Sequence, residues 1–200
     1  MLARLEVIEG PMFAGKSEEL MRRMRIERIA RRRVLVIKPY IDSRTKAYIA
    51  ARAIGADGQS YETERVEALA IRDDEELAAA LAAPMDTIVA DECQFFGESF
   101  AHLVRNALRI RCNENLLILC AGLDTTYAMK GFGPMPALRA MADEVHRLAG
   151  ICMRCFARGA RLTQRTSGST DDVQVGDKES YEVRCIACHY VFGEEQPPSP

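Results

Sequence analysis

Short apolar runs alternate with longer segments of helical periodicity over residues 1–120. Each run is bounded by polar or turn-forming residues, which is the pattern of strands buried on both faces. These runs occupy residues 5–8, 33–38, 87–90 and 116–120. Helical periodicity follows Ser17 and Asp73 and spans 100–111, and Pro84 closes the second helix. Strand, crossover helix and strand in this order predict an α/β fold with a mostly parallel sheet flanked by helices.

The segments between these elements are assigned from weaker patterns. Residues 40–60, which follow Pro39, contain Gly55, Gly58 and several polar positions and predict a loop. Residues 61–70 alternate between polar and apolar positions and predict an edge strand. An amphipathic helix is predicted over residues 137–148, with apolar positions at Leu138, Met141, Val145 and Leu148. All of these elements would belong to one domain over residues 1–149.

The segment between the first run and the first helix matches the phosphate-binding pattern G-x-x-x-x-G-K-[ST] at every fixed position. Backbone N–H groups of such a loop, with the positive end of the next helix, hold phosphate oxygens. Lys16 would reach the β- and γ-phosphates, and the Ser17 hydroxyl would bind Mg²⁺. A glycine-rich turn that carries a lysine by chance is the alternative, but the strand–loop–helix context favours a nucleoside triphosphate site. Its expected residues are Gly10, Pro11, Met12, Phe13, Ala14, Gly15, Lys16 and Ser17.

A second polar cluster follows the third apolar run. Asp91 lies at a strand end, where an acidic residue commonly binds Mg²⁺, and the adjacent Glu92 is placed to act as a base or an orienting group. Either acid could instead belong to a solvated turn. Cys93 and Gln94 continue the segment and are expected to complete the nucleotide site. The aromatic pair that begins at Phe95 could line a base pocket or belong to the core.

Composition excludes several classes of function. The 200 residues are 48% hydrophobic and 28% charged, and 27 basic residues against 29 acidic ones give a net charge of −2. The chain therefore has no overall attraction for nucleic acid or an anionic membrane. No apolar run approaches the roughly 18–20 residues of a membrane span, and the first residues lack a signal-peptide pattern. We therefore expect a cytoplasmic protein that binds neither nucleic acid nor a membrane, and whose cysteines are metal ligands or free thiols.

Four of the seven cysteines form two close pairs, separated by residues 156–184. The pairs are Cys152-x-x-Cys155 and Cys185-x-x-Cys188. Four thiolates in this spacing are the usual tetrahedral ligands of a closed, structural Zn²⁺ site. Buried cysteines without a metal are the alternative, and His189 could replace Cys188 as a ligand. We predict a zinc-binding domain over residues 150–192 and a disordered, proline-containing tail over 193–200. The remaining cysteines, expected to be free thiols, are Cys93, Cys112 and Cys120.

Together these motifs resemble the type II thymidine kinases, the family related to the human cytosolic enzyme. The resemblance extends over about residues 4–190. The residues that carry it are 10–17, Asp42-x-Arg44, Asp91-Glu92-x-Gln94-Phe95-Phe96, Leu123-Asp124, Phe132-Gly133, the two cysteine pairs and Tyr181. The phosphate-binding loop alone is unspecific, whereas the ordered set is specific. One departure is Ala56, where many family members have a histidine before Asp-Gly.

The resemblance implies a reaction and a set of site residues. The family transfers the γ-phosphoryl group of ATP to the 5′-hydroxyl of thymidine, and deoxyuridine is expected to be tolerated. Glu92 matches the general base, Arg44 matches an arginine near the transferring phosphates, and the segment between the cysteine pairs matches a lasso that closes over the nucleoside. The expected thymidine contacts are Met12, Phe95, Leu123, Tyr127, Leu162, Thr163, Val173, Gln174, Val175, Gly176 and Tyr181. A homotetramer with feedback inhibition by dTTP is also implied.

Two other functions remain compatible with the residues. A nucleotide-dependent switch or ATPase with a zinc-ribbon arm would hydrolyse nucleotide without phosphorylating a nucleoside. Such an arm is usually basic, whereas basic and acidic residues are nearly balanced over 150–190. The other alternative keeps the fold and changes the acceptor to a different deoxynucleoside. Phosphoryl transfer to thymidine is the function that accounts for all of the motifs.

Overall fold

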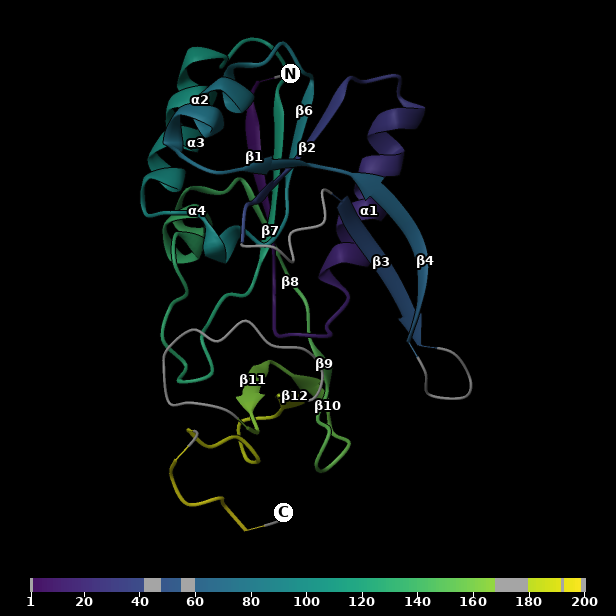
Figure 1. Cartoon of the computed structure of the whole chain (residues 1–200), viewed down its shortest axis with the longest axis vertical. Coiled ribbons are helices and arrows are strands. Elements are labelled where there is room, and N and C mark those ends of the chain that lie inside the picture. Colours follow the sequence, from purple (N-terminus) through teal and green to yellow (C-terminus); the bar gives the residue numbers. More distant parts are fainter. Residues whose placement is uncertain (1, 42–47, 55–59, 168–179, 192, 199–200) are drawn as a thin grey trace.

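The computed structural model describes residues 2–41, 48–54, 60–167, 180–191 and 193–198. Its centre is a six-stranded sheet in the order β5-β2-β6-β7-β1-β8, in which every neighbouring pair is parallel (Figure 1). The strands are β1 Arg4–Glu9, β2 Val34–Pro39, β5 Leu69–Ile71, β6 Thr87–Ala90, β7 Leu117–Gly122 and β8 Glu144–Arg147. The predicted parallel α/β fold is therefore confirmed.

Helices cover both faces of this sheet, as Figure 1 shows. Their bounds are α1 Lys16–Ile29, α2 Asp74–Ala82, α3 Ser99–Ile110 and α4 Met135–Met141. Alternate residues of β1 face opposite sides, because successive side chains of a strand point apart. Leu5 and Val7 pack in the cluster formed with α2, α3 and α4, whereas Ile8 packs in the cluster formed with α1. In the part of the chain that the structure describes, no helix is long and apolar enough to cross a membrane.

A β-hairpin, β3 Tyr48–Ile54 and β4 Ser60–Glu67, packs beside α1 (Figure 1). Ile49 and Val66 bury their side chains in the cluster that contains α1. The predicted loop over 40–60 is therefore wrong in part, and the predicted edge strand over 61–70 is divided. β4 pairs with β3, and only β5 joins the main sheet beside β2. The apolar pattern of a hairpin such as β3–β4 is weak, because one face of the paired strands stays exposed and carries polar residues.

The predicted helix over 137–148 is wrong beyond Met141. Asp143 instead exchanges hydrogen bonds with β1: its N–H donates to the Leu5 carbonyl oxygen at 2.9 Å, and its carboxylate accepts the Leu5 N–H at 2.8 Å. β8 then continues along β1 in parallel. Without β8, the edge of β1 would present unpaired backbone N–H and C=O groups. Pairing these groups favours a strand after Asp143, although the apolar residues there have helical spacing.

The segment after residue 149 forms two short antiparallel pairs beyond the carboxyl ends of the main strands (Figure 1). β9 Gly150–Ile151 pairs with β10 Arg158–Ala160, and β11 Leu162–Arg165 pairs with β12 Tyr181–Arg184. Among the described residues of this segment, the buried apolar cluster consists of Cys152, Ala160, Val183 and Cys188. So small a core cannot hold four short strands by hydrophobic burial alone, which explains why this segment carries the cysteine pairs.

Candidate active site

The carboxyl ends of β1, β6 and β7 meet at one edge of the sheet, and the segments expected to carry the chemistry follow them. β1 leads into the loop 10–17, β6 leads into Asp91 and Glu92, and β7 leads into Leu123 and Asp124. The strand order thereby brings together segments that are far apart in the sequence.

The phosphate-binding loop has a backbone that suits an anion. Gly10 has a φ of 150°, and a Cβ atom there would lie 2.7 Å from the Leu148 carbonyl oxygen, so only glycine fits. Gly15 has a φ of 83° and leads into the first turn of α1, where the N–H groups have no carbonyl partners within the helix. Lys16 Nζ donates to the Pro11 carbonyl oxygen at 2.7 Å, so the lysine lies over the loop. N–H donors and an ammonium group can therefore surround phosphate oxygens.

Two acids face this lysine. Burial lowers the pKa of Lys16, and the charges of Glu92 and Asp91 oppose that effect. Burial, with the adjacent Glu92 charge, raises the pKa of Asp91 to about 7, although the Glu92 N–H donates to the Asp91 carboxylate at 2.9 Å. The positive charges near the Asp91 carboxylate therefore do not offset the cost of burying its negative charge. Its chemistry fits a bound divalent cation with oxygen ligands.

The aromatic residues after these acids have separate roles. Phe96 is buried and stacks on Phe100 with ring centroids 4.3 Å apart, so it belongs to the core. Phe95 is half-buried and meets the edge of Phe132 at 5.4 Å. The choice between pocket and core that the sequence left open is therefore resolved for Phe96, whereas Phe95 is only half-buried.

The segment beyond residue 149 contacts the phosphate-binding loop directly. The Met12 N–H donates to the Thr163 hydroxyl at 3.1 Å, which joins the loop to β11. Beside this contact, Arg165 lies with its guanidinium carbon 4.1 Å from the centre of the Tyr127 ring and donates to the Tyr181 hydroxyl at 3.0 Å. These contacts bring residues from both parts of the chain to one place.

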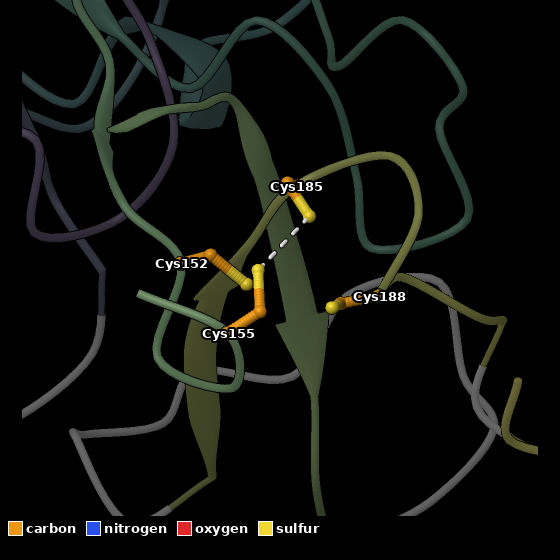
Figure 2. Close-up of side chains that lie close together, drawn as sticks. All are labelled: Cys152, Cys155, Cys185 and Cys188. Atoms are coloured by element: carbon orange, nitrogen blue, oxygen red, sulfur yellow. Dashed lines mark hydrogen bonds between the residues drawn. The ribbon is translucent and has the colours of Figure 1, made fainter. Parts of the chain in front are cut away.

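The four paired cysteines converge, as Figure 2 shows. Their Sγ atoms all lie within 4.8 Å of one another, and those of Cys155 and Cys185 are 3.6 Å apart. A Zn–S bond of about 2.3 Å places tetrahedral sulfur ligands about 3.8 Å apart, so the arrangement fits a zinc ion. His189 lies outside this set. The predicted cysteine cluster is confirmed, with Cys188 rather than His189 as its fourth member.

Two thiols of this cluster have pKa values shifted in opposite directions. Burial raises the pKa of Cys152, but backbone N–H groups of Cys155, Cys185 and Arg154 outweigh it and lower the pKa to about 6. Burial and the neighbouring thiols raise the pKa of Cys188 to about 12. The Cys152 thiolate therefore forms readily and the Cys188 thiolate does not, and a bound dication would favour the ionised form of both.

Comparisons with known proteins agree with this geometry. The family model described as thymidine kinase matches residues 3–189. A curated thymidine kinase from Deinococcus radiodurans is 41% identical over 207 residues, an alignment that covers 98% of this chain and 94% of that protein. This chain belongs to the thymidine kinase family. The resemblance inferred from the motifs is confirmed, and family membership makes the protein a phosphotransferase that uses ATP.

The family's expected site residues are described only in part. Leu162 is half-buried and Phe13 is exposed. The Cys93 thiol is buried and donates to the Ala90 carbonyl oxygen at 3.3 Å. The three cysteines expected to be free thiols are free. Outside the described residues lie the expected site residues Arg44, Val173, Gln174, Val175 and Gly176, and also Ala56, the departure from the family pattern.

The sequence patterns did not predict the burial of Arg165 in this thymidine kinase family member. Arg165 is 0% exposed and is the largest fully buried side chain among the described residues. Its guanidinium lies between the rings of Tyr127 and Tyr181, at 4.1 and 5.5 Å from their centres. Arginine is almost never buried without a partner, so a sequence pattern assigns it to the surface. Its burial depends on Tyr127 and Tyr181, which are distant from it in the sequence, so no local pattern indicates it.

Glu9 is a second buried charge at this edge. It is 1% exposed, and within the described residues neither of its carboxylate oxygens accepts a hydrogen bond. Arg139 and Arg147 form ion pairs with it at 3.5 Å and line a cavity of about 200 Å³ beside it, and Arg147 also donates to Asp124 at 2.8 Å. Burial raises the pKa of Glu9 above its usual 4.5, against the attraction of the arginines.

We expect Glu9→Gln to raise the melting temperature at pH 8 by about 2–4 °C, which corresponds to about 1 kcal/mol in a chain of this size. The folded pKa lies above the unfolded value, so the stability that Glu9 contributes is present below pH 4.5 and is lost as pH rises. The neutral amide avoids this loss, and the gain should shrink toward pH 5. Thermal melts at pH 5 and 8 test it, with the exposed Glu144→Gln as control. Equal melting temperatures at pH 8 would refute the assignment of an ionised, destabilising Glu9.

Proposed function

We propose that this protein transfers the γ-phosphoryl group of ATP to the 5′-hydroxyl of thymidine, giving dTMP and ADP, and that it tolerates deoxyuridine. The observation that carries the proposal is the convergence of Lys16, Asp91 and Glu92 beside the phosphate-binding loop. Together they supply a phosphate ligand, a metal ligand and a base in one place. The Deinococcus relative is a thymidine kinase, which supports thymidine as the acceptor.

Each group has a defined task in this reaction. The N–H groups of the loop hold the phosphates, and Lys16 neutralises charge on the β- and γ-phosphates. Ser17 and Asp91 would hold Mg²⁺, which would supply positive charge to offset the charge of the phosphates. Glu92 accepts the proton of the 5′-hydroxyl as that oxygen attacks phosphorus. Arg44, outside the described residues, would offset charge on the equatorial oxygens.

The thymidine site is proposed between the two parts of the chain. Met12, Phe95 and Leu123 would surround the thymine methyl group, with Tyr127 and Tyr181 packed near the base. The hydrogen bond between Met12 and Thr163 supports this placement, because it brings β11 against the loop that holds the phosphates. Backbone groups at 162–163 and 173–176 would then read the base edge, with the lasso excluding water from the transfer.

The remaining expectations follow from the same assignment. A structural zinc ion would hold the two ends of the lasso through the cysteine cluster. The domains would be a kinase domain over 1–149 and a zinc-binding lasso domain over 150–192, followed by the tail 193–200. We also propose a cytoplasmic homotetramer in which dTTP inhibits by occupying the nucleoside site, with no nucleic acid or membrane partner.

Transfer of labelled γ-phosphate from ATP tests this function. The purified protein is incubated with Mg²⁺ and thymidine, deoxyuridine, deoxycytidine, deoxyadenosine or no acceptor. Labelled dTMP, with a weaker deoxyuridine product and little product from the other two, is expected. Labelled inorganic phosphate in every reaction, without a nucleotide product, would replace the proposal by a nucleotide-dependent switch or ATPase. A product with another nucleoside alone would change the acceptor.

A further inference from the structure

Gln94 lies at the centre of the candidate site and is only 2% exposed. It belongs to a short 3-10 helix, η2 Cys93–Phe95, directly after the acids. Its Nε2 donates to Glu92 Oε2 at 2.6 Å, and its Oε1 accepts the Leu123 N–H at 3.0 Å. The amide orientation is fixed by chemistry, because a backbone N–H can only donate and a carboxylate can only accept. Both ends of this side chain are therefore committed to named partners.

Two glycines pack closely against Gln94. A Cβ atom at Gly122 would lie 2.7 Å from Gln94 Oε1, and one at Gly133 would lie 2.3 Å from the Gln94 carbonyl oxygen. Gly133 also has a φ of 49°, a conformation that favours glycine. The end of β7 and the turn before α4 therefore enclose Gln94 from two sides. Its amide is held in place rather than free to move with Glu92.

Glu92 needs such support. It has a φ of 54°, in the left-handed region, and its side chain is half-buried with several rotatable bonds. Oε2 accepts the Gln94 donor, while among the described residues Oε1 accepts no hydrogen bond. A base that must meet a hydroxyl within about 3 Å loses rate when its carboxylate turns away. A hydrogen bond to one oxygen restricts that rotation and leaves the other oxygen for the proton.

We propose that Gln94 is a positioning residue for Glu92, and that it ties the base to the wall of the nucleoside site at Leu123. This inference rests on the proposed function. It differs from a direct contact with ATP, which the sequence led us to expect for Gln94. The same amide spans from the carboxylate to the β7 loop, so the base and the nucleoside pocket form one hydrogen-bonded unit.

A double-mutant cycle tests the proposal. Gln94→Met keeps the length of the side chain and removes both hydrogen bonds, so kcat should fall about 10–100-fold with KM for ATP and thymidine changed less than about threefold. In a Glu92→Gln background the same change should cost less than about twofold, because its effect passes through Glu92. Equal loss in both backgrounds would overturn the proposal. An increase confined to KM for ATP would overturn it in favour of nucleotide contact.

Two further variants separate positioning from folding. Gln94→Glu retains the shape and the acceptor for the Leu123 N–H, but it sets a second carboxylate against Glu92; kcat should fall while ATP affinity and zinc content stay unchanged. Gln164→Met removes a buried glutamine that bonds Tyr190 and Arg165 instead, so its cost should be the same in both Glu92 backgrounds. Near-wild-type kcat in Gln94→Glu would refute the proposal. Absence of dTMP from the wild-type protein would instead refute the proposed function.

Discussion

Glu92→Gln is expected to lower kcat by about two to four orders of magnitude while the affinity for ATP stays unchanged. The amide has nearly the same shape as the carboxylate, and its oxygen can still accept the hydrogen bond that Gln94 Nε2 donates. What it loses is the ability to take a proton from the 5′-hydroxyl. The phosphate-binding loop, Lys16 and Asp91 all remain, so binding of the triphosphate should be preserved.

Single-turnover transfer of labelled phosphate to thymidine, combined with calorimetry of ATP binding, checks both halves of this prediction. Glu98→Gln is the matched control, because Glu98 lies on the same segment and is exposed. Its turnover should stay within about twofold of the wild type. Turnover near the wild type in Glu92→Gln would remove Glu92 from the role of base. Loss of ATP affinity in parallel with turnover would assign it to nucleotide binding instead.

The sequence predicted the central sheet and the phosphate-binding loop because both are encoded locally. A strand buried on two faces is a continuous apolar run, and the loop owes its shape to glycines at fixed spacing. β8 escaped prediction for the opposite reason. Its residues are largely exposed, and Val145 at helical spacing from Met141 satisfies a helix pattern equally well. Only the vacant edge of β1, more than 130 residues earlier, makes the segment a strand.

The candidate site likewise contains residues that a local pattern predicts and residues that it does not. Residues 10–17, Asp91 and Glu92 are recognisable because they occupy fixed positions relative to strands. The contacts of Gln94 with the β7 loop and of Arg165 with two distant tyrosines are made only after folding. No local pattern encodes either contact. The contacts of such buried polar side chains are seen only in the folded structure and not in the sequence motifs.

Cys188→Ser is expected to abolish zinc binding and to raise KM for thymidine at least about tenfold, with a smaller effect on ATP affinity. Cys188 is fully buried in the small apolar cluster of the zinc-binding segment. Without the metal, little remains to hold β9 to β12, and both ends of the lasso are released. Removal of zinc by a chelator should have the same effect on the wild-type protein.

ATP binding should survive better, because the elements that carry the phosphate-binding loop and Asp91 belong to two other apolar clusters. A hydrogen bond between Thr163 and Met12 links the zinc-binding segment directly to that loop. Losing one such bond costs about 1 kcal/mol, or roughly fivefold in affinity. Zinc content, ATP affinity and KM for thymidine are measured together, with Cys112→Ser as control because Cys112 is an exposed free thiol. If both substrates were lost equally, zinc would hold the whole fold rather than the nucleoside site.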